Sequence, residues 1–179
     1  TGNMAYGDKV KKIPHAALSL EDAEMLARMQ ARGEKIRIQL KMEAHMLPDG
    51  FSRNVIADIP GSEHPEQIVI VSGHIDSWDV GQGAMDDGGG CLAAWEAARL
   101  MMKLGLKPRR TIRVVLWTNE ENGIRGAKEY ARRHAAELKN HVLAIESDSG
   151  VFNPTGYGFL GSVKGMETIQ AIGKLLDSI

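Results

Sequence analysis

Four short polar clusters stand out in this chain, because each contains side chains that can bind a metal ion or move a proton. They are His74-Ile75-Asp76, Asp86-Asp87, Glu120-Glu121 and Asp148. An imidazole nitrogen combined with several carboxylate oxygens is a ligand set that suits zinc. The four clusters together therefore predict a zinc centre.

The spacing of the clusters indicates different roles for their members. Two metal ions held about 3.5–4 Å apart need a carboxylate that bridges them. Asp86 is placed for that role, because it lies in a loop that opens a helix, and a helix N-terminus favours negative charge. Asp76 stands two residues after His74, so along an extended segment both side chains point the same way. We expect the Asp76 carboxylate to accept a hydrogen bond from the imidazole and fix its tautomer.

Glu120 and Glu121 are neighbours, so their side chains cannot both point at one place. One of them as a metal ligand and the other as a general base for water is a natural division. The residue pattern does not decide which glutamate has which role. Asp87 has a different expected role, as the N-cap of the helix that follows it.

These clusters need elements that bring them together, and the apolar pattern predicts such elements. Continuous β-branched runs indicate buried strands over 67–72, 110–118 and 141–145, and helical periodicity indicates helices over 90–104 and 124–138. Strand, helix, strand, helix, strand is typical of an α/β sheet with parallel pairs. In such sheets reactive groups collect at the carboxyl ends of the strands, where the clusters stand.

The first third of the chain has a different pattern. Ser19, with Asp22 three residues later, predicts a helix start, and Gly33 predicts its end. Alternating polar and apolar residues predict half-buried strands over 35–42 and 54–59. The last residues form an apolar-periodic helical run without a stop signal, which predicts that the chain is a fragment of a longer protein.

Composition excludes several classes of protein. Lys and Arg number 22 and Asp and Glu number 23, so no basic footprint for nucleic acid or an anionic membrane is present. No apolar run approaches the roughly 18 residues of a membrane span. The single cysteine, Cys91, excludes an internal disulfide framework, and its apolar helical context favours core packing over a nucleophile.

The clusters and their surroundings resemble the M28 zinc peptidases. The resemblance rests on His74-Ile75-Asp76, the Gly83-Ala84-Met85-Asp86-Asp87 loop, the Glu120-Glu121 pair and Glu146-Ser147-Asp148-Ser149-Gly150. It implies that His74 and Asp148 bind one zinc, that Glu121 binds a second and that Asp86 bridges both. It also implies that Glu120 is the general base and Asp76 the orienting carboxylate. The family's second zinc takes a further histidine from downstream of residue 179, so this chain would hold only one complete position.

The same resemblance implies a fold and a domain organisation. The fold is α/β, with a mixed, largely parallel sheet flanked by helices, as in zinc exopeptidases. Residues 1–33 would be the end of a protease-associated domain, and residues 34–179 the first part of the catalytic domain. An equally weighted alternative is that the opening helix packs on the same sheet.

We therefore expect a metal-dependent exopeptidase or dipeptidase with two zinc ions. Its partners would be a small peptide with a free terminus and a second copy of the full-length protein, and it would be secreted or lysosomal by resemblance. Two alternatives stay open. One is a single-zinc acyl-transfer enzyme similar to the glutaminyl cyclases, which share this fold. The other is an inactive fragment or a non-catalytic isoform.

Overall fold

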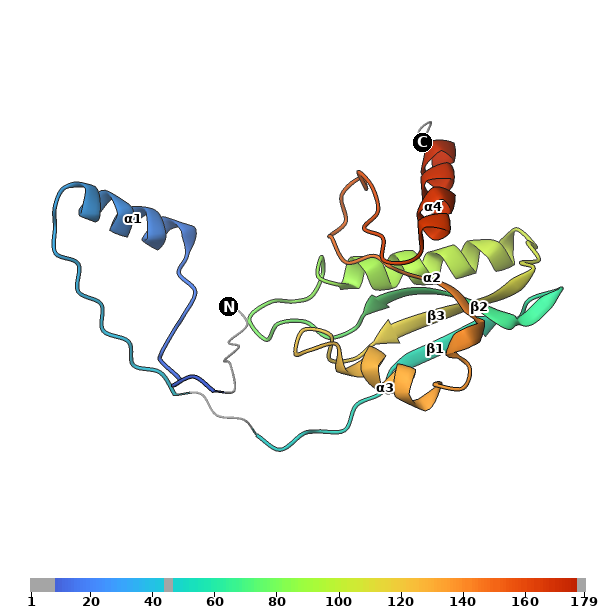
Figure 1. Ribbon diagram of the computed structural model, residues 1–179, viewed down its shortest axis with the longest axis horizontal. Helices are drawn as coiled ribbons and strands as arrows, with labels where there is room; N and C mark the ends of the chain where they lie inside the picture. Colours follow the sequence, from blue (N-terminus) through green and yellow to red (C-terminus); the bar gives the residue numbers. More distant parts are fainter. Residues whose placement is uncertain (1–8, 44–46, 177–179) are drawn as a thin grey trace.

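A computed structural model of the chain describes residues 9–43 and 47–176 (Figure 1). Its elements in chain order are α1 (Leu20–Ala31), β1 (Val55–Ile59), β2 (His64–His74), α2 (Gly88–Lys103), β3 (Arg110–Trp117), α3 (Arg125–Arg133), the short 3-10 helix η1 (Leu138–Asn140), β4 (His141–Glu146) and α4 (Val163–Leu176). The outer limits of both expected domains, at residues 1 and 179, lie outside the described residues.

One mixed sheet forms the centre of the molecule. Its strand order is β1-β3-β2-β4, with β2 parallel to both β3 and β4 and with β1 antiparallel to β3. The predicted fold class, a mixed and largely parallel sheet flanked by helices, is confirmed. His74 lies opposite Trp117 and Ser72 lies opposite Glu146, so the carboxyl ends of the three parallel strands meet at one edge of the sheet.

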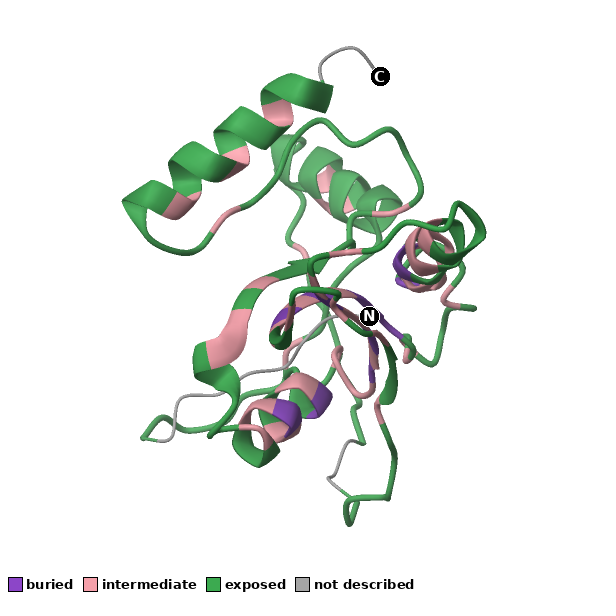
Figure 2. Ribbon diagram, turned by 90° about the vertical axis from the view of Figure 1, so that its right-hand side faces the viewer, coloured by how far each residue is buried: buried purple, intermediate pink, exposed green. Residues whose placement is uncertain are grey.

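The hydrophobic core lies between the sheet and the helices that cover it. Figure 1 shows α2 on one side of the sheet and α3 on the other. Val115 in the middle of β3 is completely buried and packs with residues from β2 and α3. Its buried partners are Ile68, Ile70, Trp117 and Tyr130. Figure 2 shows this buried region as the purple segments of the sheet and its flanking helices, whereas α1 and α4 contain no buried residue.

The predicted helices form, with one adjustment of length. Ser19 accepts a hydrogen bond from the backbone N–H of Asp22 at 3.1 Å, as expected for the cap of α1. The second crossover helix was expected over 124–138, but α3 ends at Arg133. The chain turns after that point because His141 must reach β2, where it pairs with Ile68.

The strand predicted over 35–42 is wrong. These residues form no strand, and most of their apolar residues are exposed, with Ile38 59% and Leu40 47% accessible. Alternation marks a segment that can be half buried, but a strand also needs a neighbour that completes its hydrogen bonds. The segment predicted over 54–59 does have one, because β1 pairs with β3. The division into domains at residues 33 and 34 stays a prediction.

Within the described ranges, 9–43 and 47–176, none of the helices is both long and apolar enough to cross a lipid bilayer.

The position of Val115 gives a test of the core. Replacing Val115 with Ala should lower the free energy of unfolding of the whole protein by about 2 kcal/mol, because it leaves a cavity in a fully buried site. Val142→Ala in β4 is the matched control, since its side chain is 55% exposed and should change stability by less than about 0.5 kcal/mol. Chemical denaturation measures both, and equal effects would contradict the described core.

Candidate metal centre

The sheet brings the predicted polar clusters to one edge. His74 is the last residue of β2, and Asp148 follows β4 by two residues. Asp86 precedes the cap of α2, the helix that packs against β2. Glu120 and Glu121 follow β3 in the loop that leads to α3. The convergence follows from the parallel register, because neighbouring parallel strands end on the same side.

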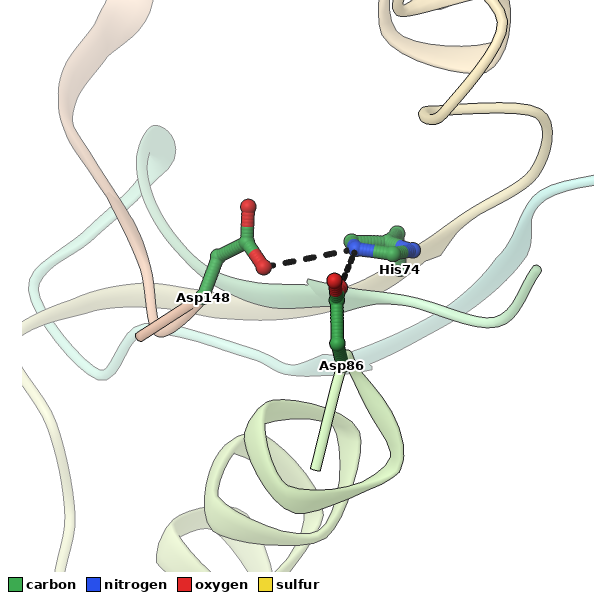
Figure 3. A group of neighbouring side chains, drawn as sticks. All are labelled: His74, Asp86 and Asp148. Carbon is green, nitrogen blue, oxygen red and sulfur yellow. Dashed lines mark hydrogen bonds and ion pairs between the residues drawn. The ribbon is translucent and has the colours of Figure 1, made fainter. Parts of the chain in front are cut away.

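His74 lies at the centre of this group, and its side chain is 99% buried. Nε2 of the imidazole is 3.0 Å from Oδ1 of Asp86 and 3.4 Å from Oδ1 of Asp148 (Figure 3). Both carboxylates are partly exposed, so the group opens on one side to solvent. A buried imidazole nitrogen therefore points at two oxygens that can only accept hydrogen bonds when ionised.

The other ring nitrogen fixes the tautomer of His74. Nδ1 is 2.9 Å from the backbone carbonyl oxygen of Asp76, and a carbonyl can only accept, so Nδ1 carries the hydrogen. The neutral imidazole then directs the lone pair of Nε2 toward Asp86 and Asp148. Burial lowers the pKa of His74. The hydrogen bond to the Asp76 carbonyl and the charge of Asp148 raise it by more, so the net pKa is above its ordinary value. The geometry thus favours a positive charge between Nε2 and the two carboxylates.

The Asp76 carboxylate has a different main contact from the one expected. It lies 3.7 Å from Nδ1 of His74, beyond hydrogen-bonding distance, whereas its two oxygens accept from the backbone N–H groups of Glu120 at 2.9 Å and Glu121 at 3.3 Å. The backbone of Asp76 therefore orients the imidazole, and its side chain holds the glutamate loop. The reason is that β2 and β3 end side by side, which places residue 76 directly against the loop after Trp117.

Both glutamates lie within the electrostatic reach of the cluster. Burial raises the pKa of Glu120, and the charges of Asp148 and Asp76 raise it further. Burial also raises the pKa of Glu121, and the charge of Asp86 raises it further. Oε1 of Glu121 is buried and has no hydrogen-bond partner among the described residues. A buried carboxylate oxygen without a donor fits the role of a metal ligand.

Asp87 is a buried carboxylate that sequence analysis assigned only to capping. Its Oδ1 accepts from the backbone N–H of Gly90 at 2.9 Å, which confirms the cap of α2. Its Oδ2 accepts from the backbone N–H of His74, also at 2.9 Å. Burial raises the pKa of Asp87 more than these two hydrogen bonds lower it. The peptide bond between Asp86 and Asp87 is cis. Asp87 thus joins the end of β2 to the start of α2, a role that only the three-dimensional contact shows.

Two glycines make this close approach possible. A Cβ atom at Gly73 would lie 2.5 Å from the backbone nitrogen of Cys91, in the first turn of α2. A Cβ atom at Gly90 would collide with the backbone oxygen of Ser147, which follows β4, and with the Asp87 carboxylate. The first turn of α2 therefore packs directly on the ends of β2 and β4. Cys91 donates from its Sγ to the carbonyl of His74 at 3.1 Å, and burial raises the pKa of this thiol to about 11, so it is not poised as a nucleophile.

The donor set fits a metal ion such as zinc. One ligand atom each from His74, Asp86 and Asp148 can be chosen so that all three lie within 4.8 Å of one another. One nitrogen and two carboxylate oxygens leave an open position in a tetrahedral site, as catalytic zinc requires. Glu120 and Glu121 are not part of this three-residue group. Glu121 would have to belong to a second position, which Asp86 could share.

Comparisons with known proteins agree with this geometry. The family model described as "Peptidase family M28" matches residues 54–178. The chain is 52% identical over 179 residues to carboxypeptidase Q of Homo sapiens and, at the same identity, to carboxypeptidase Q of Xenopus laevis. A crystal structure of a peptidase M28 precursor from Shewanella amazonensis superposes with a TM-score of 0.73 and 42% identity, over 82% of this chain and 33% of that one. The resemblance expected from the motifs is confirmed.

The chain covers only part of these relatives. It is aligned along its whole length with both carboxypeptidase Q sequences, but it spans 38% of the length of each. The family match begins at residue 54, one residue before the start of β1. The chain that contains this centre therefore corresponds to only part of the length of each relative.

The packing at Gly90 gives a test of the centre. Gly90→Ala should destabilise the whole protein by about 1–3 kcal/mol, because the new methyl group forces the first turn of α2 away from Ser147. Gly156→Ala is the matched control, since a Cβ atom there would meet nothing within 4 Å. Thermal unfolding of both variants measures the difference. A Gly90→Ala variant as stable as the Gly156→Ala variant would show that α2 does not approach β4 so closely.

Proposed function

This chain belongs to peptidase family M28, and we propose that the protein that contains it is a zinc-dependent exopeptidase or dipeptidase. Its substrates would be small peptides with a free terminus, in keeping with the carboxypeptidase Q relatives. The observation that carries the proposal is the arrangement around Nε2 of His74. Nε2 faces Asp86 and Asp148, and the buried Oε1 of Glu121 has no hydrogen-bond partner among the described residues.

The proposed ligand set divides into two positions. His74, Asp86 and Asp148 would hold one zinc, and Asp86 and Glu121 would contribute to a second. When bound, the zinc ions would polarise the scissile carbonyl and lower the pKa of water. Nδ1 of His74 donates to the Asp76 carbonyl, so this backbone contact would keep the imidazole ring in its ligating orientation.

Glu120 would act as the general base. Its pKa is raised by burial and by neighbouring carboxylates, which makes it a better proton acceptor than an exposed glutamate. Glu120 would take a proton from the attacking water and return it to the leaving amine. Asp76 would hold the backbone of Glu120 in place, and so position its side chain, because the Asp76 carboxylate accepts a hydrogen bond from the Glu120 backbone N–H.

The alternatives differ in a way that can be measured. A single-zinc acyl-transfer enzyme would need only the three-residue group, whereas the buried, unpartnered Oε1 of Glu121 favours a second metal position. By resemblance, the whole protein would work as a secreted or lysosomal homodimer. By the same resemblance, the second position would take a further histidine from outside residues 1–179, and these residues alone would then have weak or no activity.

Removing the general base gives the first test. In the full-length protein, Glu120→Gln should lower kcat for dipeptide hydrolysis by about 100- to 10,000-fold, because the amide cannot accept the proton of water. The bound zinc should be unchanged, as elemental analysis would show. Glu24→Gln on α1, where the side chain is 61% exposed, is the control and should retain full activity. Hydrolysis by the Glu120→Gln variant at the rate of the control would refute the assigned role.

Zinc stoichiometry gives the second test. The wild-type full-length protein should hold about two zinc ions per chain. Asp148→Asn and Glu121→Gln should each reduce this number to about one, and Asp86→Asn should weaken both, because Asp86 would be the ligand that the two positions share. Equilibrium dialysis with elemental analysis measures the occupancy. A wild-type value near one, unaffected by Glu121→Gln, would favour the single-zinc alternative.

A further inference from the structure

The loop between β3 and α3 follows an unusual backbone path. Asn119 and Ile124 both have left-handed φ angles, of 54° and 59°, although neither is glycine. Residues other than glycine disfavour this conformation, so the surrounding contacts must hold the loop in place. The loop carries Glu120 and Glu121, so whatever holds its path also sets the position of both carboxylates.

The Asn54 side chain contacts both ends of this loop. Its Oδ1 accepts from the backbone N–H of Thr118 at 3.0 Å, where the loop leaves β3. Its Nδ2 donates to the backbone carbonyl of Gly126 at 2.9 Å, where the loop enters α3. A direct backbone hydrogen bond from the Gly126 N–H to the Thr118 carbonyl oxygen, also 2.9 Å, joins the same two ends of the loop. One side chain therefore fastens both ends of the segment that holds the glutamates.

The space at Gly126 is shaped for this contact. Gly126 is buried, and a Cβ atom there would collide with Oδ1 of Asn54 and with the backbone oxygen of Thr118. The amide of Asn54 thus occupies the place that a side chain at residue 126 would take. The register of β1 explains its position, because Val55 pairs with Leu116 and Asn54 therefore stands beside the end of β3.

The chemistry of the two contacts requires an amide. Thr118 offers a donor and Gly126 an acceptor, and an asparagine side chain provides one group of each kind. An aspartate of nearly the same shape would keep the first contact, but it would place an oxygen against the Gly126 carbonyl. The Glu120 and Glu121 amides are held separately by Asp76, so Asn54 and Asp76 fix the loop at its ends and at its middle.

We infer that Asn54 is a positioning residue for the reaction, which holds the Glu120–Glu121 loop so that Glu121 reaches the second metal position and Glu120 reaches the water. This inference rests on the proposed peptidase function. It assigns Asn54 no contact with substrate or with the reacting atoms. Its effect should fall on one zinc position and on kcat, because His74, the ligand of the other position, is held by contacts with Asp87 and Asp76 that do not involve Asn54.

The test compares Asn54→Asp with Ser52→Ala in the full-length protein. The Ser52 hydroxyl contacts the side chain of Thr118 at 2.6 Å but is exposed and makes no described contact with the ends of the loop backbone, so it is a neighbouring control. Asn54→Asp should lower kcat roughly 10- to 100-fold, as the loss of an outer partner of a metal site does, with KM changed less than about threefold. Zinc occupancy should fall by about one ion per chain, and the ion that Asp148→Asn removes should be retained.

Asn54→Ser serves as a second variant, because it removes the donor to Gly126 without adding a charge. Normal kcat and zinc occupancy in both variants would overturn the inference and leave the peptidase function standing. Equal loss of both zinc ions, in parallel with a lower unfolding temperature in both variants, would overturn it in favour of a general structural role. A wild-type protein without zinc-dependent hydrolysis, indistinguishable from its Glu120→Gln variant, would instead overturn the proposed function and this inference with it.

Discussion

The buried carboxylate of Asp87 is the contact on which the rest of the centre depends. It accepts from the backbone N–H groups of His74 and Gly90, and so it joins the last residue of β2 to the first turn of α2. Asp87 is only 1% exposed, so the two hydrogen bonds have to compensate for its lost hydration. Asp86 is the preceding residue, and this junction therefore brings its carboxylate to Nε2 of His74. Gly73 and Gly90 are required because any side chain there would separate the two elements.

A concentration of negative charge follows from this arrangement. Asp86 and Asp148 face the same imidazole nitrogen, and the pKa values of Glu120 and Glu121 are raised by burial and by their acidic neighbours. When His74 is neutral, the three atoms that face one another, Nε2 of His74 and one Oδ1 each of Asp86 and Asp148, are all acceptors. A divalent cation would offset this charge more completely than a proton on His74 can, because it carries two charges and could contact Asp86 and Asp148 at once. The family match and the geometry thus point to the same chemistry.

The sequence was sufficient for the parts of the fold that depend on periodicity. The three β-branched runs became β2, β3 and β4, and the capping roles of Ser19 and Asp87 were found where expected. Periodicity failed at 35–42, because an alternating pattern does not contain the partner strand. It also overextended α3, since the need for His141 to reach β2 is a tertiary constraint.

For the site, residue types and spacing predicted that the polar clusters converge, and the resemblance to the M28 peptidases singled out His74, Asp86 and Asp148. Neither predicted the contacts behind them. The Asp76 carboxylate was expected at the imidazole and lies instead at the glutamate loop. Asn54 had no signal of its own, because its partners Thr118 and Gly126 are more than 60 residues away along the chain. Such backbone contacts across the fold carry no motif.

The most direct test of the metal centre is anomalous X-ray diffraction at the zinc edge from crystals of the full-length protein grown with zinc. We expect one peak about 2.0–2.2 Å from Nε2 of His74 and from oxygens of Asp86 and Asp148. A second peak should lie about 3.5–4 Å from the first, beside Glu121. The absence of a peak at His74, with Nε2 still hydrogen-bonded to Asp86, would contradict a metal centre at this edge of the sheet.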